Sequence, residues 1–334
     1  MSSLIFIIIF GGLSLIPISD DYRYYTVPAH NWTIGESKLY DDNGLDFYYM
    51  PWSLLITVPL HFLPDHLGQA ILNLVSLFFI FFSVQTIVGK LVWWQWFLLL
   101  CNLFIVNLMF TVQWDALVLG GVAIAWWGVN RNNPWLCGTG IMLAATKPTN
   151  AILPLIIVII YGLQHRNFKY FKRFFFIPFV LLVLSFLACG LDWPIRYFNF
   201  IKTYPPREYY NISIWKVFMQ IGIPTWLILI ICLMVISYFS WISYRRKADA
   251  ITLATALVVN MVVSPYLVSY HLVGTSPALG WIFRKKWYWG AAIYLSMLII
   301  FLGVADILKT PPIVIYPLLI LIAMLILSSN KNNL

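Results

Sequence analysis

The chain changes character at Ser19-Asp20-Asp21-Tyr22-Arg23-Tyr24-Tyr25, directly after an N-terminal run, 1–19, that has no charged side chain. About thirty mostly polar and aromatic residues follow before the apolar character returns at Pro51. The pattern predicts a first helix over 3–18. We expect this helix to be retained, because the run lacks a basic start and many apolar runs follow it. Asp20 and Asp21 then lie at its outer end, where two carboxylates are candidates for acid–base chemistry.

Composition places the whole chain in a membrane. Of its 334 residues, 61% are hydrophobic, 18% are aromatic and only 10% are charged. A soluble domain of this size carries about 25% charged residues. We therefore expect an all-α polytopic membrane protein that forms one integral membrane domain over 1–334. The cysteines lie in apolar runs without Cys-x-x-Cys spacing, which favours buried small side chains over metal sites or disulfides.

The apolar runs along the chain predict about twelve transmembrane helices. Several are shorter than the ~20 residues that a full crossing usually needs, which indicates a thinned or funnel-shaped protein. The expected spans lie near 3–18, 68–88, 93–111, 114–129, 135–146, 149–164, 173–190, 223–243, 250–264, 270–283, 287–304 and 312–328.

Charge distribution predicts the orientation of these spans. With a cytoplasmic N-terminus, the cytoplasmic loops and tail hold 13 of the 21 basic residues and, of the 12 acidic ones, only Asp249. This agrees with the positive-inside rule and places both termini in the cytoplasm. Topology thus accounts for the net charge of +9, so no nucleic-acid partner is expected. The polar residues gather on the extracytoplasmic side, where we expect the functional site.

Two long segments are expected outside the membrane. In the first, 19–67, the apolar stretch 51–64 is broken by Pro59 and is expected to form a helix in the outer interface. If it crossed the bilayer, every later basic loop would face outward. The second segment, 191–222, mixes cations such as Arg207 with aromatic residues. That mixture suits lipid headgroups or a substrate phosphate.

Lys147 stands between two apolar runs, in Ala145-Thr146-Lys147-Pro148-Thr149-Asn150. A lysine at this depth either snorkels outward or meets an anion. A phosphate is the favoured partner, because Pro148 is expected to open a new helix whose positive end would add to the lysine charge.

Gln113, Asp115 and His271 are the other polar residues at outer helix ends. Asp115 fits plain N-capping as well as a functional role. A single histidine is more often a structural hydrogen-bonding group, but His271 shares a surface with the lysine and the acids. Both interpretations remain open for each residue. Asp41, Asp42 and Asp46 are able to hold a metal, although Asp-Asp-Asn-Gly is more simply a turn.

An ordered set of motifs then suggests a family. It runs from the acidic residue with Tyr24-Tyr25 through Trp32–Gly35, Leu39-Tyr40-Asp41, Phe47-Tyr48-Tyr49-Met50-Pro51-Trp52, Gln113, Gly138–Pro148 and Ser264-Pro265-Tyr266 to Tyr270-His271. Over roughly 15–280 the chain resembles the polyprenyl-phosphate-sugar-dependent glycosyltransferases of the GT-C superfamily. Within these it is most similar to family 87 (GT87, DUF2029-like, mannosyltransferase-type). It departs from the family's usual Tyr-Pro-Pro at Tyr49-Met50-Pro51 and from Gln-Asn at Gln113-Trp114.

The resemblance implies a GT-C fold and a reaction. A hexose, mannose in the first instance, would pass with inversion from a polyprenyl-phosphate donor to a lipid- or glycan-linked hydroxyl. The membrane would be a prokaryotic plasma membrane, and no cofactor or metal is expected. The implied base is Asp21 or Asp20. The donor phosphate would be bound by Lys147, His271 and Arg207. Substrate contacts would come from Tyr24, Tyr25, Tyr49, Gln113, Asp115 and Tyr270.

Other classes of function remain open on the sequence. A flippase or transporter of lipid-linked substrates would have a similar composition, although the chain shows no convincing internal repeat. A membrane scaffold would depend on its helix faces and not on its outward polar residues.

Overall fold

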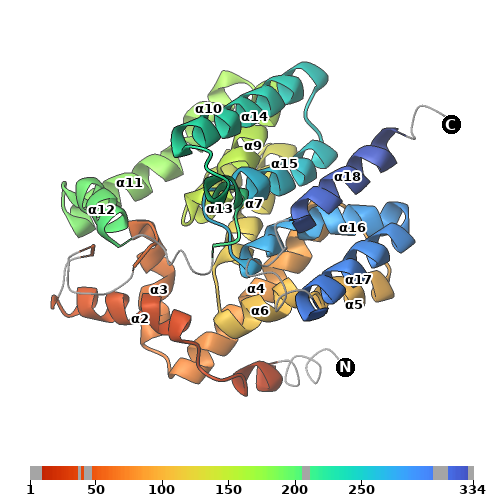
Figure 1. The fold of residues 1–334 in the computed structure, drawn as a ribbon. Helices are drawn as coiled ribbons and strands as arrows, with labels where there is room; N and C mark the ends of the chain where they lie inside the picture. The colour runs from red at the N-terminus through yellow and green to blue at the C-terminus, as the bar shows by residue number, and fades with distance from the viewer. Residues whose placement is uncertain (1–9, 37–38, 41–46, 205–210, 304–314, 330–334) are drawn as a thin grey trace.

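The chain folds as an assembly of helices in the computed structural model (Figure 1). Residues 10–36, 39–40, 47–204, 211–303 and 315–329 are described, and no strand occurs in these ranges. The elements in chain order are α2 (Asp20–Thr33), η1 (Pro51–Ser53), α3 (Leu54–His61), α4 (Asp65–Ile87), α5 (Trp93–Leu100), α6 (Leu103–Thr111), α7 (Asp115–Asn130), α8 (Pro134–Ala144), η2 (Pro148–Asn150), α9 (Ile152–His165), α10 (Phe168–Phe174), α11 (Phe176–Cys189), α12 (Trp193–Thr203), α13 (Ile214–Gln220), α14 (Thr225–Arg246), α15 (Ala250–Val263), η4 (Ser269–Thr275), α16 (Ser276–Lys285), α17 (Trp287–Gly303) and α18 (Ile315–Ser329).

The all-helical expectation is confirmed, while the count of about twelve spans is not. Within the described ranges, three helical segments are long and apolar enough to cross a membrane alone. They are α4 (Asp65–Ile87), α10 with α11 as one continuous segment (Phe168–Cys189), and α14 (Thr225–Arg246). A fourth candidate is the pair α5 and α6, which bends by 54°. Several other apolar helices, among them α7, α8, α9, α15 and α18, have 10–17 residues. They fall short of the ~20 residues of a full crossing.

Two predicted spans are interrupted. The span expected over 93–111 breaks because the Asn102 side chain accepts the backbone N–H of Phe104 and starts α6 as a new helix. The span expected over 270–283 was also wrong as one helix, because its first part is the 3₁₀ segment η4 and α16 begins only at Ser276. The span near 3–18 lies partly outside the described residues, and 10–14 of it is helical.

Among the helices of the described ranges, α7 and α8 form the most closely packed pair. Asn133 caps α8 through the N–H groups of Trp135 and Leu136, and Pro134 occupies its first position. Glycines bring the two backbones together: a Cβ on Gly121 would lie 2.4 Å from the Ala144 nitrogen. Asp115 begins α7, the first helix of this hairpin.

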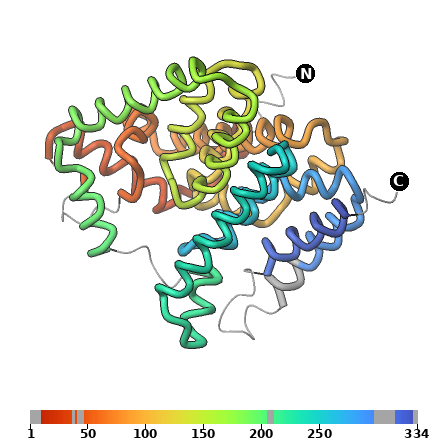
Figure 2. Tube along the Cα trace, turned by 90° about the horizontal axis from the view of Figure 1, so that it is seen from above, coloured from red at the N-terminus to blue at the C-terminus, as the bar shows by residue number. Residues whose placement is uncertain are grey.

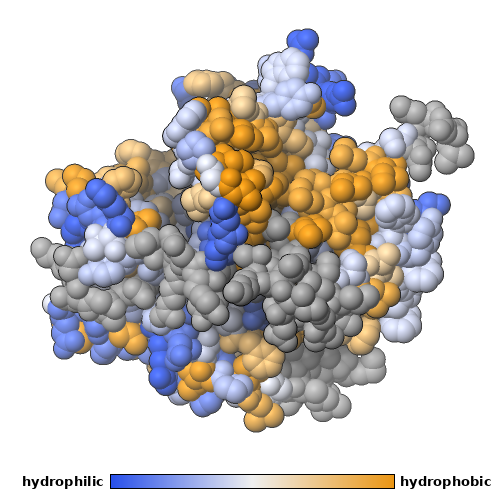
Figure 3. Space-filling view, viewed as in Figure 1, coloured by the Kyte–Doolittle hydropathy of each residue, from blue (hydrophilic) through white to orange (hydrophobic). Residues whose placement is uncertain are grey.

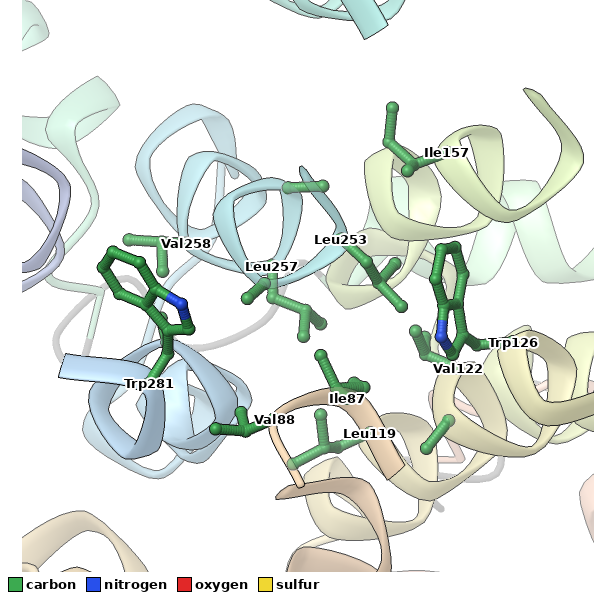
Figure 4. Close-up of a cluster of buried hydrophobic side chains, with 14 of the residues drawn as sticks. Ile87, Val88, Leu119, Val122, Trp126, Ile157, Leu253, Leu257, Val258 and Trp281 are labelled. Carbon is green, nitrogen blue, oxygen red and sulfur yellow. The ribbon is translucent and has the colours of Figure 1, made fainter. Parts of the chain in front are cut away.

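The main core lies between this hairpin and the C-terminal helices (Figure 4). Trp126 of α7 and Trp281 of α16 stand on either side of Leu253 and Leu257 from α15. The helices α2 and α3 lie at the opposite end of the molecule from α17 and α18, as the views in Figures 1 and 2 both show.

The first predicted outward segment builds a smaller aromatic core. Its helices α2 and α3 lie beside α11 and α12 in both views (Figures 1 and 2). The segment contains α2, η1 and α3, in keeping with the short helices expected there. The second segment, 191–222, contains α12 and α13. The fully or nearly buried aromatic side chains of this core are Tyr22, Tyr25, Tyr40, Phe47, Tyr49, Trp114, Trp193 and Phe200.

The outer helices expose apolar side chains. Only 11% of the residues in the most apolar stretch of Phe168–Cys189 are buried inside the protein, and the same share holds for Thr225–Arg246. Figure 3 shows a broad apolar surface over the region where Figure 1 places α14 and α18. Exposed apolar surface of this extent is typical of a lipid-facing protein.

Candidate active site

Asp21 is held at the start of α2. The Ser19 side chain caps this helix by accepting the backbone N–H of Asp21, at 3.2 Å, and its hydroxyl donates to the Thr111 carbonyl. The backbone N–H of Ser19 donates to the Gln69 side chain at 2.9 Å. The helix entry is thus tied to α4 and α6. The positive end of the helix favours an ionised carboxylate in its first turn.

Gln113 contacts the Asp21 carboxylate directly. Its Nε2 donates to Asp21 Oδ2 at 2.7 Å, and its Oε1 accepts the Tyr49 hydroxyl at 3.2 Å. These two bonds fix which end of the amide faces the acid. Gln113 follows Val112, whose φ of 54° is rare for a β-branched residue. The strained turn aims Gln113 at α2 and begins α7 two residues later.

The structure separates the two candidate acids. Asp21 is partly buried and bonded to Gln113, whereas Asp20 is exposed in the same first turn. Neighbouring residues on a helix point about 100° apart, since one turn takes 3.6 residues. The sequence left both residues open, and the geometry favours Asp21.

Lys147 forms a nearly dry ion pair with Asp115. Its Nζ lies 3.0 Å from Asp115 Oδ2, and the two side chains are 16% and 2% exposed. Asn150 donates to the other oxygen, Asp115 Oδ1. The Tyr270 ring lies 5.1 Å from the ammonium, within cation–π range. Asp115 therefore does not cap its helix. Its carboxylate forms the ion pair with Lys147 instead.

The predicted helix opening at Pro148 was wrong. Pro148–Asn150 is a three-residue 3₁₀ segment, and α9 starts only at Ile152. The backbone N–H of Leu153, in the first turn of α9, already bonds to the Asn260 side chain at 3.0 Å. A helix end that is capped by its own protein adds little to a phosphate site.

His271 is fully buried beside Asp115. Its Nδ1 accepts the backbone N–H of Val268, so its Nε2 carries the proton of the neutral ring. That nitrogen lies 3.8 Å from Asp115 Oδ1, which is beyond hydrogen-bonding distance. His271 has no exposed surface, so its ring is not accessible from outside the protein.

The predicted tyrosines divide into two groups. Tyr25 and Tyr49 are buried, and their hydroxyls donate to the Val112 carbonyl and to Gln113. Burial raises the pKa of both phenols well above the usual value, so they remain neutral donors. Tyr24 and Tyr270 are only partly buried. Arg207 lies outside the described residues, as do Asp41, Asp42 and Asp46.

These contacts join two parts of one site. Asp21, Gln113 and Tyr49 form one part, and Asp115 and Lys147 with their neighbours form the other. Gln113 and Asp115 are separated only by Trp114, whose ring lies 4.8 Å from that of Tyr49. A carboxylate and an ammonium group are thereby both anchored to the turn 112–115.

A comparison with models of protein families identifies the family of this chain. The model of Glycosyltransferase family 87 matches residues 47–269, about two thirds of the chain. The chain belongs to glycosyltransferase family 87. No curated protein and no solved structure matches it. As a GT87 glycosyltransferase, it takes a sugar donor and an acceptor as substrates.

The matched region contains only part of the site. Tyr49, Gln113, Asp115 and Lys147 lie within 47–269. Asp21 and His271 lie outside it, so only the fold connects them with the matched residues. In the part of the chain that is described, no group of three or more His, Cys, Asp or Glu side chains is arranged to hold a metal ion.

Sequence reasoning missed two members of the site. Asn150 orients Asp115, and Trp114 packs against both Tyr25 and Tyr49. A signal existed for Asn150, because it lies three residues after Lys147 in a polar stretch between apolar runs. For Trp114 the signal was the departure from the family's usual Gln-Asn at Gln113-Trp114, which did not indicate that the ring packs on the two tyrosines.

Proposed function

We propose that this GT87 glycosyltransferase moves a hexose, mannose in the first instance, from a polyprenyl-phosphate donor to a hydroxyl of a lipid- or glycan-linked acceptor. The observation that supports this most is the joining of the Asp21 carboxylate and the Lys147 ammonium through the single turn 112–115. One group suits an acceptor proton, and the other suits a donor phosphate.

Asp21 acts as the general base. The acceptor hydroxyl gives its proton to the carboxylate while its oxygen bonds to the anomeric carbon. The bond from that carbon to the phosphate oxygen breaks, and its electron pair leaves with the polyprenyl phosphate. Gln113 holds Oδ2 of Asp21 at 2.7 Å and so keeps the carboxylate oriented. A single displacement of this kind inverts the anomeric configuration.

Lys147 stabilises the charge that gathers on the leaving phosphate. Its ammonium group is the more exposed partner of the ion pair, while Asp115 is nearly inaccessible. A positioned cation of this kind acts on charge that develops in the transition state. Asp115 and Asn150 hold the lysine in place before the donor arrives.

The reaction takes place on the extracytoplasmic face. Support comes from the basic residues of the opposite loops, which the positive-inside rule places in the cytoplasm. Two of these residues also cap helices: Arg166 donates to the carbonyls of Val129 and Asn130, and Arg284 to that of Val88. Cations at helix C-termini are favoured by the helix dipole.

The test compares Asp21→Asn with Asp20→Asn in the purified full-length protein. Transfer is measured from radiolabelled polyprenyl-phosphate mannose to lipid extracts. We expect Asp21→Asn to lower the rate by about 10²–10⁴-fold, the usual value of general-base catalysis. Asp20→Asn, on the exposed side of the same turn, should stay within a few-fold of wild type.

Two results would contradict the proposal. Wild-type transfer rates in Asp21→Asn would remove Asp21 as the base. No transfer by the wild type from mannosyl, glucosyl or arabinosyl polyprenyl phosphates would remove this donor class and bring lipid-substrate transport forward.

A further inference from the structure

An apolar groove of about 290 Å³ runs between α3 and α11. Its walls are the α3 face with Leu55 and Val58, the α11 face with Leu181 and Leu184, and the ring of Trp32 at the end of α2. Leu55 is 63% exposed and Leu184 is 48% exposed, so the groove opens along the outside of the protein.

The groove lining is almost entirely apolar, and two of its polar groups already have partners. The Ser185 hydroxyl donates to the Leu181 carbonyl at 2.7 Å. The indole N–H of Trp52 donates to the Met142 carbonyl at 2.9 Å. The groove therefore makes no demand for a polar ligand, and it suits a hydrocarbon chain.

The groove begins next to the active site. Pro51 lines the groove, and Tyr49 of the site lies two residues before it. Between them, the Met50 backbone N–H donates to the Thr146 carbonyl at 3.3 Å, and Thr146 directly precedes Lys147. Two residues of chain span only about 7 Å. A lipid whose phosphate lies at Lys147 therefore has this groove within reach of its first chain carbons.

The other wall leads to the membrane. The helix α11 belongs to the apolar segment Phe168–Cys189. Only 11% of the residues in the most apolar stretch of this segment are buried inside the protein. A chain that leaves the groove along α11 enters the lipid. The groove thus connects an anion-binding end with a lipid-facing surface.

We infer that the α3–α11 groove binds the prenyl chain of the lipid-phosphate sugar donor. This inference rests on the proposed function, because it takes the phosphate of that donor to lie at Lys147. Apolar walls recognise the chain by burial alone, so affinity depends on chain length and on free space in the groove.

Filling the groove tests the inference. Leu184→Trp places a large ring in the groove, and Leu55→Trp does the same from the opposite wall. Leu187→Trp is the matched control, because Leu187 lies on the same helix, is 77% exposed and does not line the groove. Each variant is assayed with a full-length polyprenyl-phosphate sugar and with a water-soluble donor of truncated chain.

We expect both groove variants to raise KM for the long-chain donor roughly tenfold, as for about two methylene groups kept in water. KM for the truncated donor and kcat for both donors should stay at wild-type values. The control should match wild type throughout. If wild type uses the long-chain donor and all three variants do too with unchanged KM, the groove assignment is wrong. If wild type uses neither donor, the proposed function itself fails.

Photocrosslinking identifies the occupant directly. A polyprenyl phosphate with a diazirine in its first isoprene units should label α3 and α11, and unlabelled polyprenyl phosphate should compete. Labelling of the same residues by a photoreactive phospholipid that polyprenyl phosphate does not displace would assign the groove to bulk membrane lipid and overturn the inference.

Discussion

At the scale of single residues, the Asp115–Lys147 pair combines stability with function. Both charges are largely removed from water, so either one becomes costly when its partner is lost. We expect Asp115→Asn to lower the free energy of unfolding by about 3 kcal/mol. Lys147→Met should cost less, because Asn150 still donates to Asp115. Thermal unfolding in detergent measures both.

The double variant shows whether the pair acts as a unit. Asp115→Asn with Lys147→Met should destabilise less than the sum of the single changes, by at least about 1 kcal/mol. Additive costs would mean that the two charges are stabilised independently.

At the scale of helices, the close packing of the α7–α8 hairpin depends on glycines, which have no side chain. A Cβ on Gly140 would lie 2.3 Å from the Ala125 backbone nitrogen, so Gly140→Ala must push the helices apart. We expect a loss of about 1–3 kcal/mol in stability. Gly162→Ala is the control, because its nearest neighbour is the Phe171 ring at 3.2 Å, which is able to shift. Alanine is also the better helix former there. Equal melting temperatures of the two variants would argue against close packing of the hairpin.

A histidine pair links the ends of α2 and α3. His30 Nδ1 and His61 Nε2 lie 3.0 Å apart, and burial together with His30 lowers the pKa of His61 below 6.5. The unfolded chain then binds a proton more readily than the folded one. The stabilisation is therefore complete above about pH 6.5 and decreases as the pH falls below it. Between pH 7.5 and 5.5 the melting temperature should fall further in wild type than in His61→Gln. Equal falls would show that the pair does not contribute.

At the scale of the whole molecule, the charge distribution predicts which end faces the cytoplasm. In a Cys101→Ala background, which removes the exposed cysteine, Asp20→Cys should react with a membrane-impermeant maleimide added to intact cells. Arg246→Cys, at the end of α14, should react only after the cells are permeabilised. The reverse pattern would place the active site in the cytoplasm and contradict the proposed donor side.

The amino-acid sequence alone was enough to predict the class of this protein and its family. Composition and apolar run lengths do not depend on which residues contact each other, so they were sufficient to predict an all-helical membrane protein. The ordered motifs over roughly 15–280 predicted the family, which the match over 47–269 confirms. The number of spans was not predictable in this way, because a single side chain such as Asn102 starts a new helix while the stretch around it stays apolar overall.

How the residues of the site pair follows from the three-dimensional fold. Asp20 and Asp21 are equivalent in sequence, and the contact with Gln113, 92 positions away, distinguishes them. The partner of Lys147 is Asp115, 32 positions away and not the helix end at Pro148. The α3–α11 groove likewise exists only where two separate helices meet. Such pairings depend on which surfaces pack together, and packing joins residues that no local pattern connects.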